Sequence, residues 1–254
     1  MENMMNQREN IQELDGNLQA FPSAERVFSE KQPWLKEHFM PLISIDLAAL
    51  NPEWQGRVVH MLCPFEPFEC YIGEETAAHH NEFTAPNWFA FRLNEDNQYE
   101  FLGNEGYFLR TAVNHWDFDS EAEKYFQKMQ ENVYKSQENV AKFGYLVSVN
   151  YPEYNGKHNI CNFLDNMGGG LWYGNWTESA EMPSAFKMSL PPVGTTWDKL
   201  DELPNDGIEI SYQGNPFYFI ADVAGYNYCG SGADAIILMY EPVSQIVLFT
   251  FDWT

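Results

Sequence analysis

Two histidines and a glutamate that could bind a metal ion stand close together in the segment HHNE, at His79, His80 and Glu82. Imidazole nitrogens and carboxylate oxygens are ligands of zinc and iron. Adjacent side chains of an extended chain point to opposite sides, however, so the two histidines do not form a ready chelate. The chain has no second, spaced pair of histidines to complete such a set. We therefore interpret the segment as a polar loop and predict no metal site and no cofactor.

A group that could transfer protons lies in the segment NHWDFD. In an extended chain His115, Asp117 and Asp119 would share one face, which would suit general acid–base catalysis. Asp119 is also explained as a cap that accepts the first backbone N–H groups of a following helix. We favour the cap and predict that the protein is not an enzyme. A metal-assisted hydrolase that uses His79, His80 or His115 is the alternative.

Two glycine-rich segments raise further catalytic hypotheses. Gly168 to Gly170 could bring backbone N–H groups close to a phosphate, but the lysine of a P-loop is missing. Cys229 and Ser231 lie in YCGSG, which is not the G-x-S-x-G pattern of a serine nucleophile and has no histidine after it. We interpret the first segment as a loop packed against Trp172 and Trp176, and the second as a turn between strands.

Acidic side chains beside aromatic rings are the strongest candidates for a binding surface. The chain has 37 acidic and 14 basic residues, which gives a formal net charge of −23. Such a charge repels nucleic acid and anionic membranes, and it accelerates encounter with a basic protein. We predict a partner protein with a basic active-site cleft. The predicted contact residues are Glu95, Asp96, Glu100, Glu105, Trp116, Asp117, Trp197, Asp198, Asp201, Glu202 and Asp206. An ordinary solvated surface is the alternative.

Length and composition indicate a globular protein with a sizeable core, because 254 residues with 16% aromatic residues can bury enough apolar surface. Residues 1–17 lack the basic start and apolar core of a signal peptide. No apolar run approaches the roughly 20 residues of a membrane helix. We therefore expect a cytoplasmic protein. In that reducing compartment, its four cysteines would be small core residues: Cys63, Cys70, Cys161 and Cys229.

Two parts of the chain share a pattern that predicts an internal duplication. In each part a proline opens an apolar run that closes on an aspartate, and a glycine follows ten positions after the aspartate. Pro41, Asp46 and Gly56 correspond in this way to Pro216, Asp222 and Gly232. The two aspartates could face each other as a carboxylate pair. We favour a structural role, because an acid at a strand end commonly accepts backbone N–H groups of the next turn.

The distribution of apolar residues predicts a β-rich α+β fold. Residues 119–143 carry an apolar stripe at helical spacing, and Gly144 is placed to end the helix. Short apolar runs bounded by turn residues predict strands on both sides of this helix. We expect a helical N-terminal segment over residues 1–39 and a single domain over 40–254. That domain would contain two related sheet modules, at about 40–118 and 162–254, joined by the helix and a strand.

The second module resembles the YwqG-like bacterial proteins. The residues that carry the resemblance lie within 167–240 and are Gly168-Gly169, PPVGTTWDKL, GNPFYFIADV and GADAIILMYEP. The resemblance implies a fold of two pseudo-repeated halves and supplies no catalytic residues. Related bacterial proteins occur as immunity partners of secreted antibacterial toxins. Together with the charge, it predicts an immunity protein that neutralises a cognate toxin through an acidic surface. A YwqG-like housekeeping protein of unknown activity is a further alternative.

Overall fold

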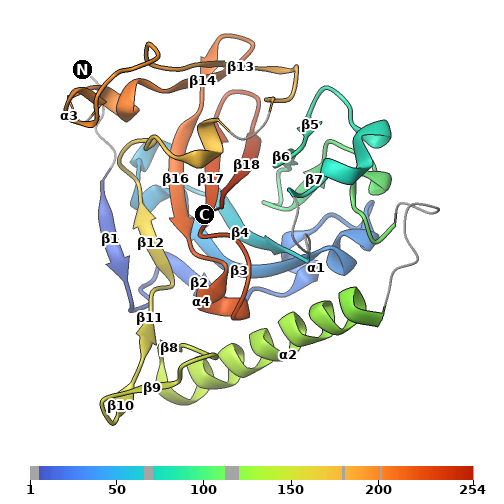
Figure 1. Ribbon diagram of the computed structural model, residues 1–254, viewed down its shortest axis with the longest axis vertical. Helices are drawn as coiled ribbons and strands as arrows, with labels where there is room; N and C mark the ends of the chain where they lie inside the picture. Colours follow the sequence, from blue (N-terminus) through green and yellow to red (C-terminus); the bar gives the residue numbers. More distant parts are fainter. Residues whose placement is uncertain (1–5, 66–70, 112–119, 179–180, 201, 254) are drawn as a thin grey trace.

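The centre of the fold is an eight-stranded antiparallel sheet, with a smaller sheet against each of its faces and a long helix across one end (Figure 1). The computed structural model describes residues 6–65, 71–111, 120–178, 181–200 and 202–253. The strand order of the central sheet is β1-β12-β16-β17-β18-β6-β5, and β7 also pairs with β6. The predicted β-rich α+β class is confirmed.

The strands in the described parts of the chain fall into five sheets. The central sheet contains β1 (Arg8–Ile11), β5 (Thr84–Ala85), β6 (Trp88–Leu93), β7 (Tyr99–Phe101), β12 (Leu164–Met167), β16 (Tyr218–Val223), β17 (Ala235–Glu241) and β18 (Ile246–Asp252). The two three-stranded sheets are β2 (Leu18–Ala20), β3 (Phe39–Asp46) and β4 (Val58–Pro64), and β13 (Phe186–Ser189), β14 (Glu209–Tyr212) and β15 (Asn215–Pro216). The two-stranded ribbons are β8 (Leu146–Val147) with β11 (Ile160–Cys161), and β9 (Glu153–Tyr154) with β10 (Lys157–His158).

Helical segments connect these strands, and most of them are single turns. The α-helices are α1 (Ala24–Val27), α2 (Ser120–Phe143), α3 (Trp197–Leu200) and α4 (Tyr226–Cys229). The 3₁₀ turns are η1 (Pro33–Glu37), η2 (Leu47–Ala49), η3 (Pro52–Trp54), η4 (Glu74–His79), η5 (Glu105–Tyr107), η6 (Asn175–Thr177) and η7 (Pro204–Gly207). None of the helices in the described parts of the chain is both long and apolar enough to cross a membrane.

The central sheet is buried on both faces, and β18 shows this clearly. Every residue of β18 is buried. Val247 and Phe249 pack into the core shared with the β2–β4 sheet, whereas Ile246 and Leu248 pack into the core beneath the β13–β15 sheet. A strand covered on both sides is largely apolar, because its alternate side chains enter different cores, and in β18 only Thr250 and Asp252 are polar. This explains the continuous apolar run at this end of the sequence.

The two predicted modules share a sheet and are not separate. The hairpin of β6 and β7 belongs to the first half of the chain, yet β6 pairs with β18 of the second half, with Phe89 opposite Phe249. The internal similarity persists locally. β3 pairs with β4, and β16 with β17, and each pairing contains one shift of register. Gly56 and Gly232, which the sequence pattern equates, both have a positive φ. The halves therefore contribute similar strand pairs to a common core.

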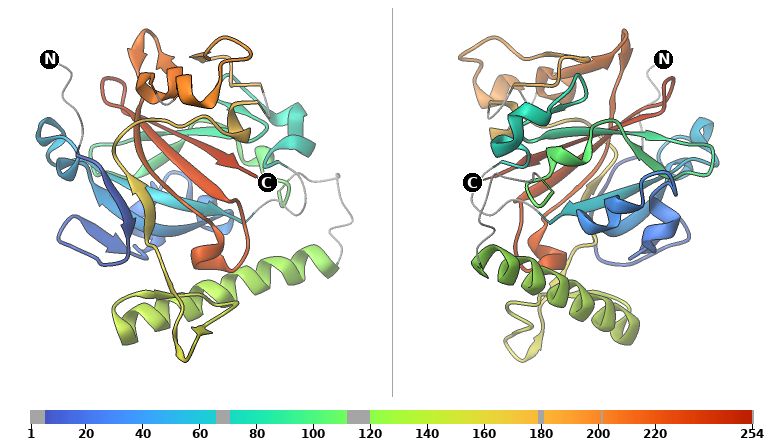
Figure 2. Two further views of the ribbon diagram at one scale, coloured as in Figure 1. Left: turned by 60° about the vertical axis from the view of Figure 1, so that its left-hand side comes forward. Right: turned by 90° about the vertical axis from the view of Figure 1, so that its right-hand side faces the viewer.

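Helix α2 lies against α4 and β8 along one end of the molecule (Figures 1 and 2). Its predicted stripe is confirmed where the side chains are described, because Phe126, Met129 and Val133 are buried. Polar contacts also fix the helix. Asn132 Nδ2 donates to the carbonyl of Cys229 at 2.9 Å, and Ser136 Oγ donates to that of Tyr228 at 2.9 Å.

The prediction of a helical segment over residues 1–39 is wrong for much of its length. Arg8–Ile11 pairs with β12, and Leu18–Ala20 pairs with β3. Only the single turns α1 and η1 are helical in the described part of this segment. Both strands lie at sheet edges and are short, so their own sequences carry little strand signal and their pairing depends on distant segments.

Candidate functional site

The histidine-rich segment lies at the end of η4 and in the residues that follow it. His79 ends η4, and His80 donates from Nε2 to the carbonyl of Gly73 at 2.7 Å. Burial lowers the pKa of His80. Across the described residues, no group of three or more His, Cys, Asp or Glu side chains is arranged to hold a metal ion. His115 and the acids of NHWDFD lie outside the described residues.

A buried serine–histidine pair was missed by the sequence reasoning. Ser44 and His60 are opposite each other on β3 and β4, and Ser44 Oγ lies 2.8 Å from His60 Nδ1. His60 Nε2 lies 2.8 Å from the carbonyl of Asn97, so the neutral ring donates there and accepts from Ser44. His60 is only 1% exposed, and burial lowers its pKa to about 4. The pair is therefore closed to substrate and stabilises the fold.

The two aspartates of the repeat have structural roles, as expected, but they differ in detail. Asp46 accepts from the backbone N–H of Ala48 in the next turn. Asp222 instead accepts from the backbone and side-chain N–H groups of Asn166 and, at 2.8 Å, from Trp172 Nε1. Burial raises the pKa of Asp222 to about 6. Its carboxylate thus fixes Trp172 above the central sheet.

The packing predicted for the triple glycine is wrong. A side chain on Gly168 would overlap the backbone oxygen of Asn6, and one on Gly170 would approach Asn205. These glycines therefore allow close approach of the N-terminal segment and the 205 loop. The glycine whose space is filled by Trp172 is Gly174. The sequence reasoning placed the contact four to six residues too early.

The predicted acidic residues that the structure describes lie in two separate places, near the β6–β7 hairpin and near α3 (Figure 1). Glu95 and Asp96 are exposed in the turn between β6 and β7, whereas Glu100 forms an ion pair with Lys31 at 2.7 Å. Glu105 is half-buried in η5. The predicted contact residues at and after α3 include Trp197, Asp198 and Glu202, which are exposed. Trp116, Asp117 and Asp201 lie outside the described residues.

The segment beside α3 is held rigidly, and Asp206 belongs to its support. Asp206 Oδ2 accepts from the backbone N–H of Tyr173 at 2.8 Å, so it is not a free contact residue. Asn205 Oδ1 accepts from the N–H of Leu171. Trp176 Nε1 donates to the carbonyl of Trp172, whose own ring is bonded to Asp222. Residues 171–176 are therefore fixed from both sides, which positions Tyr173 at the surface.

A groove of about 330 Å³ opens between Tyr173 and α3. Its aromatic walls are Tyr173 and Trp197, whose ring centroids are 6.1 Å apart at 77°. The Tyr173 hydroxyl donates to Glu178 Oε1 at 2.7 Å, and this bond raises the pKa of Tyr173. The other lining residues are Leu190, Pro191, Pro192, Val193, Gly194, Thr195 and Leu200. Trp197 is 67% exposed, an unusual state for so large an apolar side chain.

Sequence reasoning identified Trp197 and its acidic neighbours but missed Tyr173 and Glu178. Pro192, Val193 and Trp197 are exposed and give the groove an apolar surface, which the acid Glu178 also lines. Exposed apolar surface with a polar rim is typical of protein interaction sites. We therefore take the groove as the candidate functional site.

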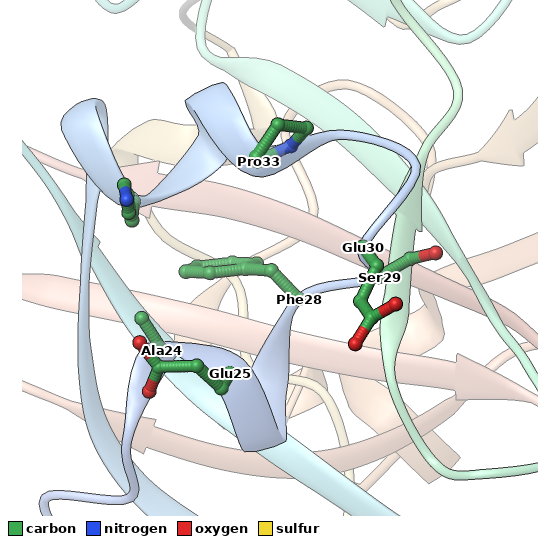
Figure 3. A pocket seen from close by; sticks show the side chains of 7 residues that line it. Ala24, Glu25, Phe28, Ser29, Glu30 and Pro33 are labelled. Atoms are coloured by element: carbon green, nitrogen blue, oxygen red, sulfur yellow. The ribbon is translucent and has the colours of Figure 1, made fainter.

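Three other pockets are less suited to this role. Figure 3 shows one of about 180 Å³ between α1 and η1, where Phe28 lies between Glu25 and Glu30, and Lys36 also lines it. A second lies between the end of α2 and the β9–β10 ribbon, and a third lies on the β13–β15 sheet beside Lys187. None of these three contains an exposed tryptophan.

Comparisons with protein-family models, with curated proteins and with solved structures find no match to this chain. The resemblance to the YwqG-like proteins stays a prediction.

Proposed function

We propose that this protein is an immunity protein that binds and neutralises a cognate antibacterial toxin, and that the groove between Tyr173 and Trp197 lies at the centre of the contact. The proposal includes a cytoplasmic location. Its main support is the exposure of Trp197 beside a groove that the acid Glu178 lines. Tryptophan is enriched among the residues that dominate binding energy in protein interfaces.

The charge of the protein supports a basic partner. A net charge of −23 would attract a toxin whose active-site cleft is basic because its own substrate is anionic. Glu178 lines the groove, and Asp198 and Glu202 are exposed close to Trp197 in the sequence. The exposed Trp197 would supply the apolar anchor, and the acids would supply orientation and a fast encounter.

The test is calorimetric titration of this protein with the product of the neighbouring open reading frame, at low and high salt. We expect tight, stoichiometric binding in the calorimeter, and an association rate, measured by stopped-flow fluorescence, that falls with salt. Trp197→Ala should weaken binding at least tenfold, since a central aromatic anchor contributes more than about 1.4 kcal/mol. The double variant Asp198→Asn, Glu202→Gln should mainly slow association.

Matched controls come from exposed residues away from the groove. Tyr151→Ala removes an aromatic ring that is 74% exposed on another part of the surface. The pair Glu95→Gln, Asp96→Asn removes the same number of charges from the β6–β7 turn. If these controls weaken binding and the groove variants do not, the contact lies elsewhere. If the neighbouring product does not bind, the immunity proposal fails.

A further inference from the structure

The groove combines aromatic rings and an acid in a way that selects for a particular ligand chemistry. Tyr173 and Trp197 meet nearly at a right angle, with 6.1 Å between centroids, and form a corner. Glu178 lines the same groove and is hydrogen-bonded to the Tyr173 hydroxyl at 2.7 Å. Ring faces and carboxylates both attract cations.

The charge balance of the lining points the same way. Glu178 is the only charged residue among the ten that line the groove. The pocket of Figure 3 has Lys36 beside its two glutamates, and the pocket on the β13–β15 sheet has Lys187 beside Glu209. Lys199 of α3 is exposed but does not line the groove. The pocket at the end of α2 also has one acid, Glu153, beside the rings of Phe143 and Tyr151. Of the four pockets compared, the groove is the one that combines such an acid with an exposed tryptophan.

Shape and rigidity also suit a long basic side chain. A volume of about 330 Å³ can hold one such chain, and the apolar Leu190, Pro191 and Val193 can cover its methylene groups. The backbone N–H of Tyr173 is bonded to Asp206, so this wall is already in place before a ligand arrives. A preformed wall reduces the entropy lost on binding.

We propose that the corner of Tyr173, Trp197 and Glu178 is a cation-binding site that takes a lysine or arginine side chain of the bound protein. The ammonium or guanidinium group would lie against the two rings and pair with Glu178. This inference rests on the proposed partner-binding role of the groove, but its test needs no partner.

The probe is Nα-acetyl-lysine amide, with Nα-acetyl-norleucine amide as the neutral control of similar shape. Binding to the intact protein is followed by NMR of the tryptophan indole N–H groups, with the Trp197 signal assigned from Trp197→Phe. We expect saturable, millimolar binding of the lysine probe that moves the Trp197 signal, and much weaker binding of norleucine. Glu178→Gln should weaken lysine binding about threefold or more. Trp197→Ala should abolish it, as followed by the line width of the probe because this variant lacks the indole, whereas Tyr151→Ala should leave it unchanged.

Equal binding of lysine and norleucine, or an unaltered affinity in Glu178→Gln, would overturn the cation site. No shift of the Trp197 signal at about 100 mM probe would also overturn it, since such a site should give Kd values near or below this concentration. The outcome is separable from the proposed function. If the probe binds and the neighbouring product does not, the site stands without the toxin; if the toxin binds and the probe does not, only the cation site fails.

Discussion

The Tyr99 hydroxyl bonds to both backbone groups of His60, accepting from its N–H at 2.6 Å and donating to its carbonyl at 2.8 Å. His60 lies on β4, the edge strand of the β2–β4 sheet, whereas Tyr99 lies on β7 of the central sheet. Asn97 completes the contact by accepting from the N–H of Val58. The β6–β7 hairpin thus provides hydrogen-bond partners for backbone groups of β4 that would otherwise be unpaired at this sheet edge.

Tyr99→Phe should therefore destabilise the protein although it removes a single atom. The backbone N–H and carbonyl of His60 would lose the hydroxyl with which they form hydrogen bonds. This loss should lower the free energy of unfolding by about 2 kcal/mol. Urea unfolding followed by tryptophan fluorescence measures this. Tyr134→Phe is the control, because Tyr134 is 64% exposed and its change should stay within about 0.5 kcal/mol. Equal stability of the two variants would show that the edge contact contributes nothing.

The buried histidines should make stability depend on pH. Burial lowers the pKa of His38 and of His60 to about 4, from about 6.5 in the unfolded chain. Between these values the unfolded chain binds protons that the folded chain does not bind. The free energy of unfolding therefore falls as pH decreases through this window, by about 1.4 kcal/mol per pH unit for each histidine.

Asp222 has the opposite effect on stability. Burial raises its pKa from 3.8 to about 6, so the folded chain binds this proton at a higher pH than the unfolded chain, and the free energy of unfolding rises as pH decreases between these values.

Comparing wild type with His60→Gln isolates the contribution of one histidine. Urea unfolding between about pH 7.5 and 5 should show the stability advantage of wild type shrinking by about 1.4 kcal/mol per unit below about pH 6.5. A constant advantage would mean that the pKa of His60 in the folded protein equals that in the unfolded chain.

The sequence was most informative where a local pattern determines an element. The stripe of α2, the strands β16 to β18 and the β6–β7 hairpin follow from spacing within each segment. β1 and β2 could not be predicted in this way, since β1 pairs with residues more than 150 positions away. The Ser44–His60 contact depends on register, which a shift in β3 between Pro41 and Ile43 makes hard to infer.

The groove shows a second limit of prediction from the sequence, which concerns contacts between distant segments. Trp197 and its acids were identified from residue type, because an aromatic beside acids is a common interface composition. Tyr173 and Glu178 are more than 15 residues earlier and line the same groove as Trp197 because Asp206, Asn205 and Asp222 fix the intervening loops. These three polar residues hold their positions through contacts between segments, which no local pattern encodes. Asp206 was accordingly assigned to the surface, although its carboxylate supports the site.

The cysteines should differ sharply in reactivity. Cys63 and Cys229 are buried free thiols, whereas Cys161 is partly exposed. Burial also raises the pKa of Cys161, so its reaction with a disulfide reagent should be slow but measurable in the folded protein. In a Cys70→Ser background, we expect one thiol to react before unfolding and two more after it. Adding Cys161→Ser should remove the first phase. Modification of Cys63 or Cys229 in the folded protein, detected by peptide mass, would contradict their burial.

Gly174 links the stability of the fold to the shape of the groove. Its φ of −155° is open to any residue, but a Cβ there would overlap the Trp172 ring and lie 2.5 Å from Asp252 Oδ2. Gly174→Ala should therefore cost about 1–3 kcal/mol through overpacking and displace Trp172 from Asp222. Because Tyr173 lies between Trp172 and Gly174, the lysine probe should also bind several-fold more weakly.

Gly16→Ala is the control, since no atom lies within 4 Å of a Cβ at Gly16. Unfolding and probe titration on both variants check this, and a Gly174→Ala protein with unchanged stability and probe affinity would show that the Trp172 support does not position the groove.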